Sequence, residues 1–178
     1  MEKSHSQKEI FLKSEADNWF YRNSKALEKI KGSDPIIACL DYADIKPDSR
    51  VLEIGCSNGW RLNLINERHD ALCWGVDPSQ EAILDGKKAV NNKIHLKVGT
   101  ADNLEFEKEF FDTVILGFFL YLVDREDLFK IAFEVDRVLK YGGNLIIYDF
   151  DPGFPRKNEY HHLKGVFSYK QDYSKMFL

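Results

Sequence analysis

Two acidic residues, one on each side of a glycine-containing turn, are the feature of this sequence best suited to chemistry. Glu53 lies in an apolar run that leads into the stretch 55–59 (GCSNG), and Asp77 ends the next apolar run, residues 72–76. Glycines keep a turn tight and let its backbone approach a ligand closely. An acid about 20 positions later, at the tip of the following strand, can accept hydrogen bonds from a ribose. Together these features predict a ligand that contains a nucleoside.

The turn must be positioned by a buried strand before it and a helix after it. Val51, Leu52 and Ile54 form a run typical of a parallel strand, and the residues from Trp60 to Ile65 have a helical pattern. The first turn of such a helix has unpaired N–H groups, which suit a polar or anionic part of a ligand.

The type of nucleoside cofactor follows from the residues inside the turn. A dinucleotide site requires G-x-G-x-x-G, and its third glycine lets the helix pack closely on the strand. Here Ser57 and Trp60 occupy the second and third glycine positions, and a tryptophan is too large for close packing. A nicotinamide oxidoreductase is therefore the less favoured alternative.

The pattern E-x-G-x-S-x-G resembles the first motif of class I S-adenosylmethionine-dependent methyltransferases, and the resemblance extends from about Arg50 to Asp151. Glu53, Gly55 and Gly59 match, while Ser57 replaces a middle glycine. The resemblance implies that Glu53 faces the ammonium group of the cofactor and that Asp77 binds both ribose hydroxyls. The full set of expected cofactor residues is Glu53, Gly55, Cys56, Ser57, Gly59, Asp77, Pro78, Ala101, Asp102, Leu116 and Gly117.

The loop after residues 94–98 resembles the adenine-contacting motif of the same family. Family members often have Asp where Thr100 stands, so Asp102 is the expected substitute that accepts from the exocyclic amine. The backbone N–H of Ala101 could meet a ring nitrogen. Leu116 and Gly117, at the tip of the fourth predicted strand, are expected to line the methionine end.

Catalytic and substrate-binding candidates lie in three places. Tyr121 falls where relatives often have His or Glu near the substrate, although it could equally be a packed aromatic. His161 and His162 are candidate bases, with surface histidines as the alternative. The predicted helix over 8–30 either packs on the edge of the core or covers the pocket, and in the second case Tyr21 or Arg22 would touch the substrate.

Five apolar runs alternate with helical segments, which predicts an α/β fold with a doubly wound, mostly parallel sheet and helices on both faces. The clearest helix is predicted over 124–140, with Gly142-Gly143 as its C-terminal cap. We expect three regions: an N-terminal helical cap (1–33), the cofactor-binding domain (34–151) and a tail (152–178) that completes the domain or contacts substrate.

Composition narrows the possible partners. The 178 residues suffice for one full core, and the net charge of −4 lacks the basic field of a nucleic-acid binder. No run approaches the length of a membrane span, and the three cysteines have no metal-binding spacing. We therefore expect a cytoplasmic protein, monomeric or homodimeric, that binds neither nucleic acid nor metal.

The resemblance implies transfer of a methyl group to the oxygen or nitrogen of a small acceptor, such as a sugar or another metabolite. The 27 residues after Asp151 are fewer than the family normally adds to its sheet. We expect that the C-terminal edge is incomplete, either because the chain is shortened or because a partner subunit completes it. The alternative function is a non-catalytic, methyltransferase-like subunit that supports a partner.

Overall fold

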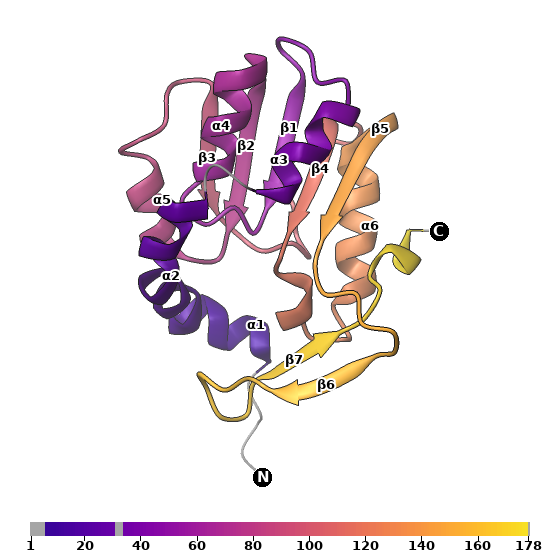
Figure 1. Cartoon of the computed structure of the whole chain (residues 1–178). Helices are drawn as coiled ribbons and strands as arrows, with labels where there is room; N and C mark the ends of the chain where they lie inside the picture. The colour runs from indigo at the N-terminus through magenta and orange to yellow at the C-terminus, as the bar shows by residue number, and fades with distance from the viewer. Residues whose placement is uncertain (1–5, 31–33, 178) are drawn as a thin grey trace.

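A five-stranded parallel sheet forms the centre of the molecule (Figure 1). The computed structural model describes residues 6–30 and 34–177. The strand order is β3-β2-β1-β4-β5, and all four neighbouring pairs are parallel. The strands are β1 (Arg50–Ile54), β2 (Leu72–Asp77), β3 (Ile94–Val98), β4 (Phe111–Gly117) and β5 (Leu139–Tyr148). This sheet confirms the doubly wound α/β fold predicted from the sequence.

Alternate residues of the strands enter two separate apolar clusters, one on each face of the sheet. Val51 and Ile115 pack on one face against α3 (Pro35–Cys39), α4 (Trp60–His69) and α5 (Gln80–Gly86). Leu52 and Val114 pack on the other face against α6 (Leu128–Val138). Glu53 shares the face of Val51, and this parity places its carboxylate beside α3 and α4.

The order of the strands creates a crevice at one end of the sheet. β1 lies between β2 and β4, so the chain connections run in opposite directions on its two sides. In the register, Ile54 is level with Val76 of β2 and with Leu116 of β4. Ligands of open α/β sheets bind outside the carboxyl ends of strands at such a point.

The two ends of the chain meet at this same end of the sheet. The N-terminal helical segment consists of α1 (Gln7–Ile10), a π-helical turn (Phe11–Glu15) and α2 (Ala16–Ile30). The C-terminal hairpin consists of β6 (Arg156–Glu159) and β7 (Phe167–Lys170), which pair antiparallel in a separate sheet. Both lie beyond the arrowheads of the parallel strands (Figure 1). Short 3₁₀ turns complete the fold at Leu40–Tyr42, Leu120–Leu122 and Ser174–Met176.

The end of α6 differs from the sequence prediction. The helix stops at Val138, and β5 begins at once with Leu139, so Gly142-Gly143 is not a helix cap. Between Leu139 and Asn144 the strand contains four residues, whereas β4 has only Asp112 at the corresponding place. The extra residues form an irregularity in which Gly142 has a φ of +74°.

Two further properties follow the sequence expectations within the described residues. None of the helices there is long and apolar enough to cross a bilayer. Cys56 and Cys73 are buried, Cys39 is exposed, and all three are free thiols.

Gly86 provides a test of how α5 packs against the glycine turn. A Cβ on Gly86 would lie 2.2 Å from the backbone oxygen of Asn58, so Gly86→Ala must displace the turn or the helix. We expect this variant to lose about 1–3 kcal/mol of stability, as is usual for overpacking. Gly153→Ala is the matched control, because no atom lies within 4 Å of its Cβ position. Urea unfolding measures both variants, and equal stabilities would contradict the packing described here.

Candidate functional site

The turn after β1 has an alternating backbone conformation, and its N–H groups are largely bonded within the fold: those of Gly55 and Cys56 donate to the Val76 oxygen and that of Gly59 to the Cys56 oxygen. Gly55, Ser57 and Gly59 all have left-handed φ angles, of +76°, +52° and +73°. Asp77 fixes this conformation, because its Oδ2 accepts from the Ser57 N–H at 2.8 Å and its Oδ1 from the Ser79 N–H at 2.8 Å. Each carboxylate oxygen has a second lone pair. Asp77 therefore braces the turn and can still accept bonds from a ligand diol.

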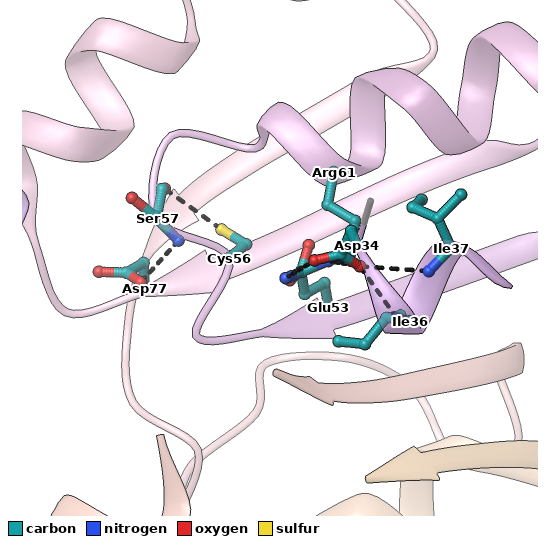
Figure 2. A network of polar contacts seen from close by, with 8 residues as sticks. All are labelled: Asp34, Ile36, Ile37, Glu53, Cys56, Ser57, Arg61 and Asp77. Atoms are coloured by element: carbon teal, nitrogen blue, oxygen red, sulfur yellow. Dashed lines mark hydrogen bonds and ion pairs between the residues drawn. The ribbon is translucent and has the colours of Figure 1, made fainter. Parts of the chain in front are cut away.

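A buried ion triad lies behind the turn (Figure 2). The Arg61 guanidinium donates to Glu53 Oε1 through Nη1, and to Asp34 Oδ1 through Nε at 3.0 Å and Oδ2 through Nη2 at 2.9 Å. Asp34 Oδ1 also accepts from the N–H groups of Ile36 and Ile37, which caps α3 as the Asp-Pro pair predicts. Three separate elements are thus joined through one guanidinium.

Glu53 keeps one oxygen free. Its side chain is fully buried, and Oε2 has no hydrogen-bond partner among the described residues. Burial raises the pKa of Glu53 to about 7, although Arg61 opposes the shift. Burial likewise raises the pKa of Asp77 to about 6, against the opposing N–H bonds from Ser79 and Ser57. A buried acceptor without a donor costs free energy, so this oxygen is suited to a ligand cation.

Two adjoining cavities lie at the carboxyl ends of the strands. The larger cavity has a volume of about 350 Å³ and the smaller about 100 Å³. Both are lined by Phe11, Gly55, Pro78 and Leu122, so they meet at these residues. The N-terminal helical segment covers both, with Phe11 and Trp19 facing the larger cavity and Lys8 the smaller.

Most predicted cofactor residues line these cavities. The larger cavity contains Gly55, Cys56, Ser57, Asp77, Pro78 and Gly117, and the smaller contains Gly55, Pro78, Ala101 and Asp102. Glu53 lies directly behind Gly117, where a Cβ would be 3.0 Å from its Oε1. Gly59 caps α4, and Leu116 is fully buried in the cluster beneath α6. The side chain of Leu116 therefore supports the site from below.

The predicted substrate residues lie outside both cavities. Tyr21 is 61% exposed, and Arg22 is directed away, toward Glu15 and the Tyr160 hydroxyl. Two other residues of the same helix, Trp19 and Asn23, line the larger cavity instead. The sequence pattern could not separate these neighbours, because all four are polar or aromatic residues on one helix.

The catalytic candidates also do not line either cavity. Tyr121 is half-buried, and its ring lies next to that of Phe118, a residue that does line the larger cavity. Burial raises the pKa of Tyr121 well above its ordinary value, which disfavours the phenolate at neutral pH. His161 and His162 are exposed in the turn between β6 and β7. Neither histidine faces the larger cavity, so the geometry does not support a base role for them.

Phe118 is a site residue that sequence reasoning missed. It lines the larger cavity and has a φ of +62°, an outlier for a bulky side chain. Its ring contacts the rings of Tyr121, Tyr148 and Phe150, with centroids 5.2, 5.6 and 4.9 Å away. Strain of this kind costs about 1–3 kcal/mol and is concentrated at functional sites.

The arrangement fits the cofactor expected from the sequence. An unpaired carboxylate oxygen suits an ammonium, the left-handed glycine turn lets its backbone approach a ligand closely, and Asp77 can accept from a diol. The smaller cavity is walled by apolar residues such as Ile54, Val76 and Ile131, which suits a planar base. The Ser57 hydroxyl, within this turn, is also buried and has no hydrogen-bond partner in the part of the chain that the structure describes.

Comparison with known proteins gives matches over this region. A family model described as "Methyltransferase domain" matches residues 52–147, more than half of the chain. Among curated proteins, the demethylmenaquinone methyltransferase of Bacillus cytotoxicus is 33% identical over 109 residues, which cover 58% of this chain and 45% of that protein. The chain thus spans about half the length of the curated relatives it matches.

Two solved structures illustrate the similarity of fold. A S-adenosylmethionine-dependent methyltransferase from Methanosarcina mazei has a TM-score of 0.63 and 22% identity, and the match covers 81% of this chain and 80% of the other. The YcgJ protein from Bacillus subtilis has a TM-score of 0.57 and 28% identity, covering 65% of this chain and 50% of the other.

The raised pKa of Glu53 predicts opposite pH dependences for binding and for stability. A ligand ammonium requires the ionised carboxylate, so affinity for S-adenosylhomocysteine should fall about fourfold between pH 8.5 and pH 6.5. The native state holds the Glu53 proton more tightly than the unfolded chain does. The contribution of this group to stability is therefore present below pH 4.5 and is lost as the pH rises to about 7.

Glu53→Gln should remove most of the pH dependence between pH 6.5 and pH 8.5, because an amide does not titrate and can still accept from Arg61, while the contribution of Asp77, whose pKa is about 6, remains at lower pH. Titration calorimetry at several pH values measures the affinity for S-adenosylhomocysteine, and urea unfolding at the same pH values measures the stability. A variant that keeps the pH dependence of the parent would show that another group carries it.

Proposed function

Because this chain belongs to the methyltransferase domain family, we propose that it transfers the methyl group of S-adenosylmethionine to a small, largely apolar acceptor. The match to this family confirms the methyltransferase family and the S-adenosylmethionine cofactor that were predicted from the sequence. The observation that supports the proposal is the pair of adjoining cavities at the glycine turn, one for the base and one for the methionine part and the acceptor.

The residues of the chain have distinct tasks in this proposal. Glu53 holds the ammonium group and is itself held by Arg61, while the turn from Gly55 to Gly59 contacts the methionine backbone. When bound, S-adenosylmethionine supplies a methyl group activated by its sulfonium charge. The N-terminal helical segment covers the cavities and excludes water. Much of the catalysis would be alignment of acceptor and cofactor, which can supply about 7–11 kcal/mol.

The lining of the larger cavity favours an apolar, ring-containing acceptor over a sugar. Trp19, Trp60, Phe118 and Tyr148 provide aromatic surface, and the nearby charge of Arg61 is already compensated by two carboxylates. A sugar requires many hydrogen-bond partners, and this lining offers few of them. The acceptor of the curated relatives, demethylmenaquinone, is a quinone and is of the same apolar kind.

Proton removal from the acceptor depends on its acidity. Tyr121 contacts Phe118, which lines the larger cavity, and its raised pKa favours a positioning role over that of a base. An acidic acceptor, such as a phenol, would need no strong base.

Ligand-dependent melting tests the cofactor. We expect S-adenosylhomocysteine to raise the melting temperature, because a ligand that binds only the native state stabilises it, and NAD to leave it unchanged. Methyl transfer to 1,4-naphthohydroquinone, followed by mass spectrometry, then separates an enzyme from a cofactor-binding subunit. Stabilisation by NAD alone would overturn the proposal.

Trp19→Ala tests the assignment of the larger cavity. With 1,4-naphthohydroquinone as the acceptor, we expect its KM to rise about tenfold or more, because burying an aromatic face contributes about 1.5–3 kcal/mol. Affinity for S-adenosylhomocysteine should be unchanged. Tyr21→Ala is the matched control, an aromatic on the same helix that lies outside both cavities. Equal KM values for the two variants would place the acceptor elsewhere.

A further inference from the structure

A hydrogen-bonded ion pair lines one edge of the smaller cavity and joins two distant parts of the chain. Lys8 Nζ, from α1, donates to Asp102 Oδ2 at 2.7 Å, and both residues line the cavity. The Asp102 side chain is only 11% exposed, while that of Lys8 is 37% exposed. The Asp102 carboxylate is therefore a largely buried acceptor, bonded to Lys8 at the polar edge of a mostly apolar cavity.

The other carboxylates of this cavity are occupied by different partners. Asp124 Oδ2 accepts from the Gln7 N–H at 2.6 Å, and Asp127 Oδ1 accepts from Lys130 Nζ at 2.9 Å. Lys8 is the one cationic side chain among the residues lining this cavity. Its ammonium has three N–H groups, and the bond to Asp102 uses one of them.

An ammonium bonded to a carboxylate presents a donor beside an acceptor. Adenine presents the complementary pattern, with the N6 amino group as donor beside a ring nitrogen as acceptor. Hypoxanthine, its deaminated form, has an oxygen at that position and reverses the pattern. The Lys8–Asp102 pair is thus matched to the amino form of the base and mismatched to the oxo form.

We propose that Lys8 determines base specificity, by donating to an adenine ring nitrogen while Asp102 accepts from the exocyclic amine. This inference rests on the proposed function, since it concerns the base of the same cofactor. It also assigns the N-terminal helical segment a role in recognition: docking of α1 completes the edge that reads the base.

The test compares S-adenosylhomocysteine with S-inosylhomocysteine by titration calorimetry, on the full chain and its variants. The parent should prefer the adenine compound. In Lys8→Met, affinity for S-adenosylhomocysteine should fall about tenfold, as expected for one hydrogen bond from a charged donor, and affinity for S-inosylhomocysteine should not fall. In Asp102→Asn the preference should shrink further, because an amide can donate to the hypoxanthine oxygen.

Gln7→Ala is the matched control for loosening of the helix. Gln7 precedes Lys8 and anchors α1 by donating to the Leu122 carbonyl at 2.8 Å and accepting from the Phe167 N–H, yet it lines neither cavity. This variant should weaken both ligands equally and keep their ratio. Lys97→Met, which removes an exposed partner of Glu105, controls for the loss of one positive charge.

The outcomes separate the inference from the proposed function. A selectivity ratio in Lys8→Met equal to that of the parent, with both affinities reduced as in Gln7→Ala, would show that Lys8 only anchors the helix and would overturn the inference alone. Failure of the parent to bind either compound would overturn the proposed function together with it.

Discussion

The buried guanidinium of Arg61 is the constraint on which the site depends. It joins β1 through Glu53 and α3 through Asp34, and it lies in the second position of α4, just after the glycine turn. Moving three charged groups out of water is costly, and removal of one partner from such a network typically costs about 3–5 kcal/mol. With two carboxylates and one guanidinium, the triad carries an excess negative charge when Glu53 is ionised. The network that fixes the strand, the turn and the helix thus leaves one buried oxygen, Glu53 Oε2, without a donor among the described residues.

Some of the left-handed backbone positions lie next to this network, while others, such as Asp44 and Glu109, lie in other loops. Gly55, Ser57 and Gly59 after β1 have left-handed conformations, and so does Phe118 after β4, the neighbouring strand. Asp77 stabilises the first group by accepting from the Ser57 N–H, and a backbone bond from the Phe118 N–H to the Tyr148 oxygen, 2.7 Å long, stabilises the second. The second bond helps to hold the unfavourable φ angle of Phe118, whose side chain lines the larger cavity. Left-handed backbone therefore occurs at the tips of two adjacent parallel strands, beside the larger cavity.

The parts of this structure that sequence could predict are those with local causes. Buried parallel strands are apolar runs, and Asp34 and Ser79 cap helices by a chemistry that is visible in the chain itself. The end of α6 could not be predicted, because a Gly-Gly pair has the same local signature whether it caps a helix or forms an irregularity in a strand. Arg61 was missed for another reason. A charged residue in a helix is normally solvated, and its pairing with Asp34, 27 positions earlier, exists only in the folded chain. Lys8 was missed for the same reason: Asp102 was predicted as a base contact, but its pairing with a lysine 94 positions earlier exists only in the folded chain.

The N-terminal helical segment, which covers both cavities, contains one local irregularity, the π-helical turn over Phe11–Glu15. Its terminal bond runs from the Ala16 N–H to the Phe11 oxygen, and this wider turn inserts an extra residue into an otherwise continuous helix. Before the turn, Lys8 faces the smaller cavity; after it, Trp19 and Asn23 face the larger cavity. Phe11, at the start of the turn, lines both. A regular helix would rotate one half of the segment by about 100° relative to the other and could not present both sets of residues. The irregularity therefore allows one helical segment to line the smaller and the larger cavity together.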